Sequence, residues 1–540
     1  MKKYICLLLT ISMAAVLLIA AKPTVFAAHL SAYYVSPDGN DASDGSTPSL
    51  PFKTIQKARD TIRSFTTMYS DIKVYIMPGK YELSSTITFN ETDSGKNGYW
   101  IHYVNYGEMP VISGGKTFNN ASWVNNVNNY YVGINTPNYP WALFEEMNGE
   151  YKPGVLARYP NKVGQENRYN TVASGPGNSN QFYYGSGTNA IPTLSGNLDN
   201  LQVCIFPGGS SGVDRWFMDI LGATVNQSTK LVTLSRNAGS TLTANSAYYI
   251  QGAYNLMDVP GEFFYNPTYS ALYYKSYTGS APNNVTIPQL TRIIDIKGTS
   301  PNNKVTNLRF EGLDLRDSNR TSQIYSGYPA NGGITLENAT NIKIVGCKIH
   351  AMGDYGIHMK DYTSYVTVGN NEIFDIGNTG IYMRGNFSRT VKNNNQRITN
   401  NHIHHCGLAV GSASGINLSN SKENEISYNT VHDTARYSIS LNAPYPAALV
   451  SYGLIEGEQP TLQNAREFTH TIGNVVKFND VSRANIESED TGVINTWGVN
   501  PGNFIQNNYI HDSGVPINVG NGLYLDDGSD GVSVTNNLIE

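Results

Sequence analysis

Gly333-Ile-Thr-Leu336 is the first copy of a four-residue unit, Gly-apolar-x-apolar, that recurs through the second half of the chain. The later copies are Gly356-Ile-His-Met359, Gly380-Ile-Tyr-Met383, Gly415-Ile-Asn-Leu418, Ser438-Ile-Ser-Leu441 and Gly522-Leu-Tyr-Leu525. The first four steps between copies are 23, 24, 35 and 23 residues. A period of this size, built from short alternating strands, is typical of a solenoid whose coils bury their apolar residues against one another.

A second unit, Asn-x-apolar followed by His or Asp, alternates with the first. Its copies are Asn371-Glu-Ile-Phe-Asp375, Asn401-His-Ile-His-His405, Asn429-Thr-Val-His-Asp433 and Asn508-Tyr-Ile-His-Asp512. Asn tolerates left-handed turns, and stacked amides can pair from coil to coil. The absence of a Leu-x-x-Leu-x-Leu pattern excludes a leucine-rich repeat. We therefore predict an all-β chain whose main part, residues 299–540, is a right-handed parallel β-helix.

The rest of the chain divides into three segments. Residues 29–116 are predicted to form the N-terminal cap and first coils, with an amphipathic helix from Thr54 to Phe65 plugging the first coil. Between residues 117 and 298 the coil rhythm stops and longer alternating runs appear, such as Phe263 to Tyr274 and Val285 to Ile296, which predicts an inserted, β-sandwich-like antiparallel module. The sequence stops inside a coil. Because a bare last coil is an aggregating edge, we expect the natural chain to continue or this end to be covered.

Residues 1–27 have the pattern of a signal peptide. Lys2 and Lys3 precede the apolar run 4–21, and Val25-Phe-Ala27 offers small residues for cleavage. We expect a secreted, extracellular protein that is monomeric and leaves the membrane once this segment is removed. The three cysteines outside it are too few and too dispersed for a disulfide scaffold or a structural zinc site.

The amino-acid composition indicates which class of ligand the protein binds. Charged residues make up 15% of the chain, the net charge is −5, and no basic cluster follows the first residues, so a nucleic-acid partner is not expected. The 37 tyrosines suit a sugar ligand, whose C–H faces stack on aromatic rings, although Tyr is also an ordinary strand residue.

Several motifs carry a family resemblance across most of the mature chain. They are Tyr34-Val-Ser-Pro-Asp-Gly-Asn-Asp41, Asp93-Ser-Gly95, Gly107-Glu-Met-Pro-Val-Ile-Ser-Gly-Gly115, Ala157-Arg-Tyr-Pro-Asn161, Val431-His-Asp-Thr-Ala-Arg436, Glu489-Asp-Thr-Gly492 and Tyr524-Leu-Asp-Asp-Gly528. Together they resemble glycoside hydrolase family 141, a group of pectin-lyase-like β-helix proteins. The resemblance implies hydrolysis of a plant cell-wall polysaccharide of the xylan or pectin type. One departure is Ile494-Asn-Thr-Trp-Gly498, where the family carries an aromatic residue and then Gly-Arg-Asp.

The resemblance places the catalytic acids at Asp490 and at the pair Asp526 and Asp527. Glycosidases use two carboxyl groups about 5–10 Å apart. If Gly492 stacks on Gly522, however, six strand positions separate Asp490 from Asp526, or roughly 20 Å. A shifted register or a folded-back loop would remove this conflict, and Asp433 or Asp512 is the alternative partner. The competing interpretation is that both motifs are simply turns.

A polar stripe is predicted along the sheet made by the first unit, because the third and fifth positions of each copy face solvent. The Asn-x-apolar unit adds a second column, which contains His404, His432 and His511, and both columns converge on the coils between about 400 and 530. The candidate substrate-binding residues are Glu489, His404, His432, Arg436, His511, Tyr382, Arg384 and Tyr524. Arg436 is suited to an acidic sugar. The His residues come from successive coils without a matched ligand set, so no zinc site is expected, and a purely structural stack is an equal alternative.

Two other functions stay open. A polysaccharide lyase of the pectate type would use Ca²⁺ held by Asp526, Asp527 and Asp530, with Lys360 or Arg384 as base. A non-catalytic carbohydrate-binding protein would need only the groove. The hydrolase interpretation requires no cofactor.

Overall fold

The computed structural model describes residues 30–136, 138–161, 168–208, 215–325, 331–513 and 520–540. The predicted signal peptide, residues 1–27, lies outside the described residues. None of the helices in the described part of the chain has the length and apolar character needed to cross a membrane.

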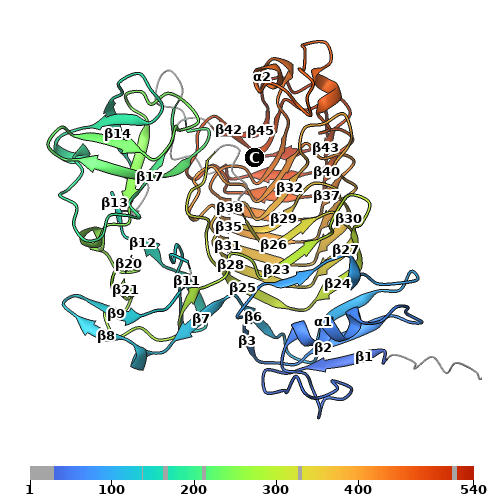
Figure 1. The fold of residues 1–540 in the computed structure, drawn as a ribbon. Coiled ribbons are helices and arrows are strands. Elements are labelled where there is room, and N and C mark those ends of the chain that lie inside the picture. Colours follow the sequence, from blue (N-terminus) through green and yellow to red (C-terminus); the bar gives the residue numbers. More distant parts are fainter. Residues whose placement is uncertain (1–29, 137, 162–167, 209–214, 326–330, 514–519) are drawn as a thin grey trace, which may run out of the picture.

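The main body is a parallel β-solenoid in which successive coils stack on one another (Figure 1). Each full coil contributes one strand to each of three parallel sheets. Sheet I contains β1 (Ala32–Val35), β2 (Ile72–Ile76), β5 (Ile101–Asn105), β24 (Val305–Glu311), β27 (Ala339–Val345), β30 (Thr363–Gly369), β34 (Arg397–Thr399), β37 (Glu425–Ser427), β40 (Val475–Lys477), β43 (Phe504–Gln506) and β46 (Ser533–Thr535), with β33 (Asn393–Asn394) beside β30.

The other two sheets complete the coil cross-section. Sheet II contains β3 (Lys80–Glu82), β6 (Val111–Ser113), β25 (Asp314–Ser318), β28 (Lys348–Met352), β31 (Glu372–Ile376), β35 (His402–Cys406), β38 (Thr430–Thr434), β41 (Asp480–Ser482), β44 (Tyr509–His511) and β47 (Leu538–Ile539). Sheet III contains β4 (Ile87–Phe89), β23 (Ile294–Lys297), β26 (Gly332–Glu337), β29 (Tyr355–Met359), β32 (Ile381–Arg384), β36 (Ile416–Ser419), β39 (Ile439–Asn442), β42 (Thr491–Trp497) and β45 (Gly520–Leu525).

The Gly-apolar-x-apolar units form sheet III, which confirms the predicted parallel β-helix. Ile357 pairs with Ile334 on one side and with Ile381 on the other, and Ile416 pairs with Ile381 and Ile439. These isoleucines are fully or almost fully buried in one continuous core. The unit repeats because every coil must fill the same interior position.

The Asn-x-apolar units form an amide ladder inside the turn between sheets I and II. The side-chain Nδ2 of Asn371 donates to Asn401 Oδ1 at 2.9 Å, and Asn401 donates to Asn429 in the same way. Three more steps continue the ladder through Asn479, Asn508 and Asn537. The left-handed residue of each turn is the one before the ladder, such as Asn370, rather than the ladder residue itself. The predicted amide pairing is therefore confirmed, while the turn position shifts by one residue.

A short amphipathic helix covers the first coil, as predicted. Helix α1 (Ile55–Arg63) begins after Thr54, whose hydroxyl accepts a hydrogen bond from Lys57 N. Ile55, Ala58 and Ile62 are buried against the solenoid core. The other helical segments are α2 (Pro446–Ser451), η1 (Glu91–Asp93), η2 (Asn120–Ser122), η3 (Gly187–Asn189), η4 (Tyr254–Leu256) and η5 (Ala465–Phe468).

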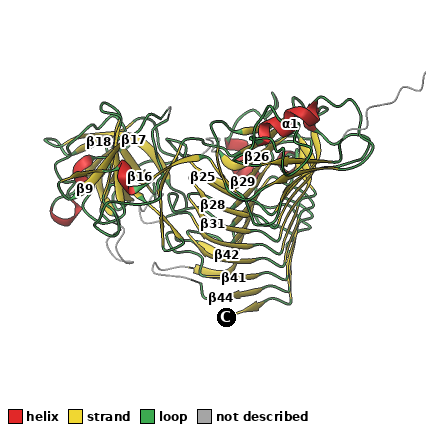
Figure 2. Ribbon diagram, turned by 90° about the horizontal axis from the view of Figure 1, so that it is seen from below, coloured by secondary structure: helices red, strands yellow, loops and turns green. Residues whose placement is uncertain are grey.

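The inserted module lies beside the solenoid, as Figure 2 shows, and its pairings are almost all antiparallel. A four-stranded sheet contains β11 (Glu150–Pro153), β10 (Phe144–Met147), β22 (Val285–Pro288) and β7 (Gly115–Phe118). A five-stranded sheet contains β12 (Val155–Leu156), β20 (Glu262–Asn266), β21 (Ala271–Tyr274), β9 (Asn129–Gly133) and β8 (Val124–Asn126). A seven-stranded sheet contains β13 (Arg158–Tyr159), β19 (Ala247–Gln251), β14 (Asn170–Ser174), β15 (Gln181–Tyr184), β18 (Leu231–Leu234), β17 (Asp219–Asn226) and β16 (Gln202–Ile205).

Two features of the module differ from the sequence prediction. Strand β16 also pairs with β19, so part of the seven-stranded sheet closes into a barrel instead of a sandwich. Closure removes the open edges that a sandwich of these short strands would expose. The run expected to be one long strand from Val285 to Ile296 is also divided: β22 pairs within the module, whereas β23 pairs with β4 and β26 of the solenoid.

Candidate active site

A cleft of about 590 Å³ lies over the last coils of sheet III, at the boundary with the inserted module. It is lined by Trp216, Phe217, Ser412, Asn417, Arg436, Tyr437, Asn442, Tyr445, Asp490, Trp497, Asp526 and Asp527. Trp216 and Phe217 belong to the module, and the other residues come from the solenoid and its loops. In Figure 1, β42 and β45 lie at the end of the stack near the C-terminus. The cleft brings together the three predicted catalytic residues and Arg436.

Asp526 follows β45 and is held in place by the neighbouring coil. Its backbone N–H donates to Thr496 O at 2.8 Å, and its Oδ1 accepts from Asp527 N at 2.7 Å. Burial raises the pKa of Asp526. The hydrogen bond from Asp527 N opposes this change, whereas the negative charges of Asp490 and Asp527 add to it. Asp526 is therefore suited to carry a proton at a pH where an ordinary aspartate is ionised.

Asp490 precedes β42 and has a left-handed backbone, with φ of 50°. Gly492 pairs with Asn521, one residue away from the Gly522 partner assumed from the repeat. The chain leaves the extended path at Asp490, so a count of strand positions does not measure its separation from Asp526. The hydroxyl of Tyr524, two residues before Asp526, donates to Asp490 Oδ1 at 3.0 Å. This hydrogen bond fixes the Asp490 carboxylate on the side of the cleft that Asp526 occupies.

Arg436 provides the cationic side of the cleft. Its side chain is buried, its Nη2 donates to the backbone oxygen of Asp490 at 3.2 Å, and its guanidinium lies 4.5 Å from the ring centroid of Tyr437. The buried Nε atom has no hydrogen-bond partner within the described part of the chain. Because an arginine can donate five hydrogen bonds, Arg436 retains capacity to bind an oxygen atom of a ligand.

The module is attached to the cleft loop by a buried ion pair. Arg168 Nη1 lies 2.6 Å from Glu487 Oε1, and the hydroxyl of Tyr169 donates to Glu487 Oε2 at 2.7 Å. Nearby, Met218 N donates to Ser412 Oγ at 3.0 Å. These contacts place Trp216 and Phe217 opposite the carboxylates. Sequence reasoning did not identify either residue, because the repeat contains no signal for what a separate module places over it.

Asn417, Asn442 and Trp497 also line the cleft without having been candidates. Asn417 and Asn442 occupy the solvent-facing third and fifth positions of their repeat units, so the repeat itself could have identified them. Trp497 lies in the segment that departs from the family pattern. This segment, Ile494–Gly498, therefore places the aromatic ring of Trp497 in the cleft.

The remaining predicted binding residues do not line the cleft. His404, His432 and His511 lie on sheet II, whereas the cleft carboxylates lie beside sheet III. Tyr382 and Arg384 are on β32, further back along sheet III, and Glu489 adjoins Asp490 without lining the cleft. Of the alternative carboxylates, Asp433 is bound by Arg483 and His432, and Asp512 lies 2.7 Å from His511. Neither of them lines the cleft.

The histidine column is a stack of parallel rings on the outer face of sheet II. Centroid distances are 4.6 Å from His350 to Phe374, 5.1 Å from Phe374 to His404 and 5.2 Å from His404 to His432. His402, which was not a candidate, lies beside the stack and 5.0 Å from His432. Burial and the charges that neighbouring imidazoles would carry lower the pKa of His404 to about 3. The signal for His402 was the His-x-His spacing within one strand.

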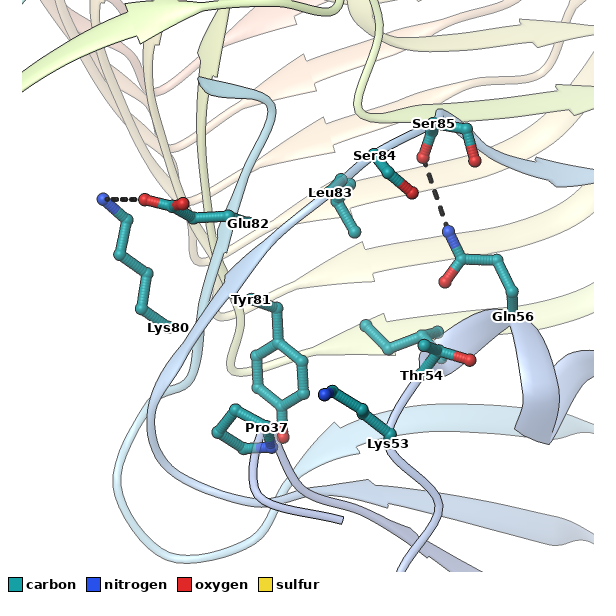
Figure 3. Close-up of a pocket in the computed structure, with 11 residues that line it drawn as sticks. Pro37, Lys53, Thr54, Gln56, Lys80, Tyr81, Glu82, Leu83, Ser84 and Ser85 are labelled. Atoms are coloured by element: carbon teal, nitrogen blue, oxygen red, sulfur yellow. Dashed lines mark hydrogen bonds and ion pairs between the residues drawn. The ribbon is translucent and has the colours of Figure 1, made fainter. Parts of the chain in front are cut away.

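Further hollows lie outside this cleft. One of about 280 Å³ is bounded by Trp141, Arg158 and Tyr249 of the module and by Leu408 of the solenoid, among other residues. Another of about 350 Å³ lies between the start of α1 and β3, where Lys80 pairs with Glu82 and Gln56 donates to Ser85 O (Figure 3). A third hollow, of about 240 Å³, is lined by Asp433 and Glu487 among other residues, but both carboxylates are already in ion pairs, with Arg483 and Arg168. In none of these three hollows do the lining carboxylates face a lining arginine as they do in the cleft beside β45, which is therefore the candidate active site.

Comparisons with known proteins agree with this architecture. The sequence model of the family described as "Right handed beta helix region" matches residues 224–396, 292–446 and 332–539. No curated protein matches the chain by sequence. A solved structure described as "Glycoside hydrolase" superposes with a TM-score of 0.74 at 16% identity, covering 94% of this chain and 96% of the other. A second, described as "The complex structure of XylC with xylose", gives a TM-score of 0.48 at 12% identity, covering 94% and 69%. The first similarity shows that the two chains share a fold.

Proposed function

Because this chain belongs to the right-handed β-helix family, we propose that it is an enzyme that hydrolyses glycosidic bonds of a plant cell-wall polysaccharide, of the xylan or pectin type. The observation that carries the proposal is the cleft in which Asp490, Asp526 and Asp527 face Arg436 and several aromatic side chains. The full-length similarity to a structure described as a glycoside hydrolase supports the same class of reaction.

The two carboxyl groups take different roles because their surroundings differ. Asp526, whose pKa is raised, is the general acid that donates a proton to the leaving glycosidic oxygen. Asp490 accepts the Tyr524 hydrogen bond and is the carboxylate that acts on the anomeric carbon, directly or through water. The charge of Asp527 helps to keep the proton on Asp526.

The walls of the cleft suit a sugar chain. Trp497 and Tyr445 meet edge to face at 5.7 Å, and Trp216 adds a ring from the module. Aromatic faces of this kind pack against the apolar faces of sugar rings, while Arg436, Asn417 and Asn442 offer hydrogen bonds to hydroxyl or carboxylate oxygens. An arginine in the lining of the cleft favours a substrate that carries uronic acid groups.

Replacement of each acid by Asn tests the assignment, since Asn keeps the shape and removes the ionisable group. We expect Asp490→Asn and Asp526→Asn to lower kcat by at least about 100-fold on the substrate identified from a panel of xylans and pectins, with a smaller loss for Asp527→Asn. Asp530→Asn is the matched control, because Asp530 lies on the same loop, is exposed and does not line the cleft. Near-wild-type activity in all three acid variants would end the assignment.

Product analysis separates hydrolysis from elimination. Among the described residues, Lys360, a candidate base of the lyase alternative, is 3.0 Å from Glu337, and Arg384 is four coils away from β45. We therefore expect saturated products and no loss of activity with EDTA. An unsaturated product absorbing in the near ultraviolet, together with a requirement for Ca²⁺, would contradict the proposed hydrolase.

We also propose that the protein is exported and acts outside the cell as a monomer. The support is the pattern of residues 1–27 and the extracellular location of cell-wall polysaccharides. N-terminal sequencing of the exported protein should place the new terminus after Ala27 or Ala28, and light scattering should give the mass of one chain. Retention of the full-length chain in the membrane fraction would contradict the export proposal.

A further inference from the structure

Four imidazoles gather on the outer face of sheet II, whereas the cleft carboxylates lie beside sheet III, so this cluster takes no part in the chemistry proposed above. His402 and His404 lie two residues apart on β35, so their side chains share one face of the sheet. His432 on β38 pairs in register with His404, and Glu372 on β31 pairs in register with His402. His405 is adjacent in the chain. Three successive coils therefore contribute metal-ligating side chains to one surface position.

The distances between these side chains are those of a metal-binding group. The ligand atoms of Glu372, His402 and His404 all lie within 4.8 Å of one another. His404 Nε2 is 3.7 Å from Glu372 Oε1, and His402 Nε2 is 2.8 Å from His432 Nε2. In a tetrahedral site with metal–ligand bonds of about 2.0–2.1 Å, ligand atoms lie about 3.3 Å apart. The Glu372–His404 and His402–His432 separations, 3.7 and 2.8 Å, lie on either side of this spacing.

A second layer of contacts orients the imidazoles. His432 Nδ1 lies 2.6 Å from Asp433 Oδ2, and the guanidinium of Arg483 contacts both groups at 2.8 Å. His404 Nδ1 lies 2.7 Å from His405 Nδ1. In both histidines Nδ1 is thus engaged and Nε2 is directed toward the cluster. Metal-ligating histidines are commonly held by a carboxylate, as His432 is by Asp433.

Ring stacking accounts for only part of the arrangement. Phe374, His404 and His432 stack as a repeat residue of a β-helix does. His402 is not in register with that stack, yet its ring lies 4.4 Å from His404 and its Nε2 points at His432. A purely structural ladder does not require this fourth imidazole or the carboxylate of Glu372 beside it.

In contrast to the expectation from the sequence, we propose that Glu372, His402 and His404, with His432 as the fourth ligand, bind a divalent transition-metal ion of the zinc class. Imidazole and carboxylate donors suit Zn²⁺, Ni²⁺ or Cu²⁺, whereas Ca²⁺ and Mg²⁺ prefer sites made of oxygen ligands alone. The bound ion links β31, β35 and β38 and so fastens three coils of the solenoid together. The site is separate from the cleft, so it stands or falls independently of the proposed hydrolysis.

Titration of the full, EDTA-treated and dialysed chain with ZnCl₂ tests the proposal by calorimetry. We expect one Zn²⁺ per chain and a rise in the melting temperature on binding, because an ion that binds the folded state stabilises it. CoCl₂ should give the intense visible absorption of a tetrahedral Co²⁺ site. CaCl₂ should change neither signal.

Variants assign the binding to the named residues. The double variant His402→Ala/His404→Ala should lose stoichiometric Zn²⁺ binding, and Asp433→Asn, which removes an orienting contact, should weaken it by about 10- to 100-fold. His102→Ala is the matched control, because His102 pairs with Asp71 on sheet I, away from the cluster, and should bind Zn²⁺ as the wild type does. His402 is exposed, so His402→Ala alone provides a folded reference, checked by circular dichroism. Weak binding at several ions per chain, or binding unchanged in the double variant, would overturn the proposal.

Discussion

Asp526 combines a catalytic position with an unfavourable environment for its charge. Its pKa is raised in the folded state, so the folded protein holds the proton more tightly than the unfolded chain does. This difference leaves stability unaffected below the unfolded pKa of about 3.9 and lowers it as the pH rises through the folded pKa.

Asp526→Asn should therefore be more stable than the wild type at pH 7, while losing activity. The gain should be no more than about 1 kcal/mol, because the group is half-buried and solvent screens its charge. Denaturant unfolding at pH 7 and pH 4 measures it, and the difference should shrink toward pH 4. An Asn variant less stable than the wild type at pH 7 would show that Asp526 makes a favourable ionic contact instead.

Tyr524 gives a second prediction at the residue scale. Its hydroxyl donates to Asp490 at 3.0 Å, and a hydrogen bond to a charged group contributes about 1.5–3 kcal/mol. Tyr524→Phe should lower kcat by about 10- to 100-fold if Asp490 must be held in one orientation. Steady-state kinetics should show the loss in kcat rather than in KM. A rise in KM with an unchanged kcat would indicate instead that Tyr524 only binds substrate.

At the scale of elements, the asparagine ladder stabilises the turn between sheets I and II. Asn429 is buried and donates to Asn479 Oδ1 and Ile398 O, while its own Oδ1 accepts from Asn401. Asn429→Ala removes these bonds and leaves buried partners unsatisfied, so unfolding should become easier by about 2–4 kcal/mol. The exposed neighbour Thr430→Ala is the control in denaturant unfolding and should change stability by less than about 0.5 kcal/mol. If both substitutions changed the free energy of unfolding by the same amount, the ladder would not stabilise the turn.

At the scale of the whole molecule, the Arg168–Glu487 pair joins the module to the cleft loop. Both side chains are buried, so Arg168→Met leaves the Glu487 charge without its partner and should destabilise the docked state by about 3–5 kcal/mol. Hydrogen exchange should rise around residues 485–490, and KM should increase because Trp216 and Phe217 are no longer held over the cleft. Unchanged exchange in this loop would show that other contacts suffice for docking.

Sequence repeats predicted the solenoid well because every coil must fill the same interior positions with apolar side chains. The isoleucine column and the asparagine ladder each recur with a spacing that only stacked coils explain. The barrel of the module was not predicted, because β16 and β19 pair across more than forty residues without any repeat between them. Local patterns carry no information on such a closure.

The candidate site was predictable to the extent that it lies on the repeat. Asp526 and Asp527 follow a repeat unit, and Arg436 precedes one, so their common surface could be inferred. The position of Asp490 could not, because its left-handed backbone takes the chain out of the extended path there. The histidines were placed in the cleft by analogy between columns, but the turn between β38 and β39 puts them on another sheet.

The inserted module also determines the order in which the chain can assemble. It separates β6 from β23 by 180 residues, yet β4, β5 and β6 must pair with β23, β24 and β25. Closing an unstructured loop of that length costs about 4–5 kcal/mol of chain entropy. The first and last strands of the module pair with each other, Gly115 opposite Pro288, so a folded module already holds the two ends together. We therefore expect the module to fold first and to bring the two parts of the solenoid together, so that in pulse-labelling hydrogen exchange the amides of β7 and β22 gain protection before those of β5 and β24.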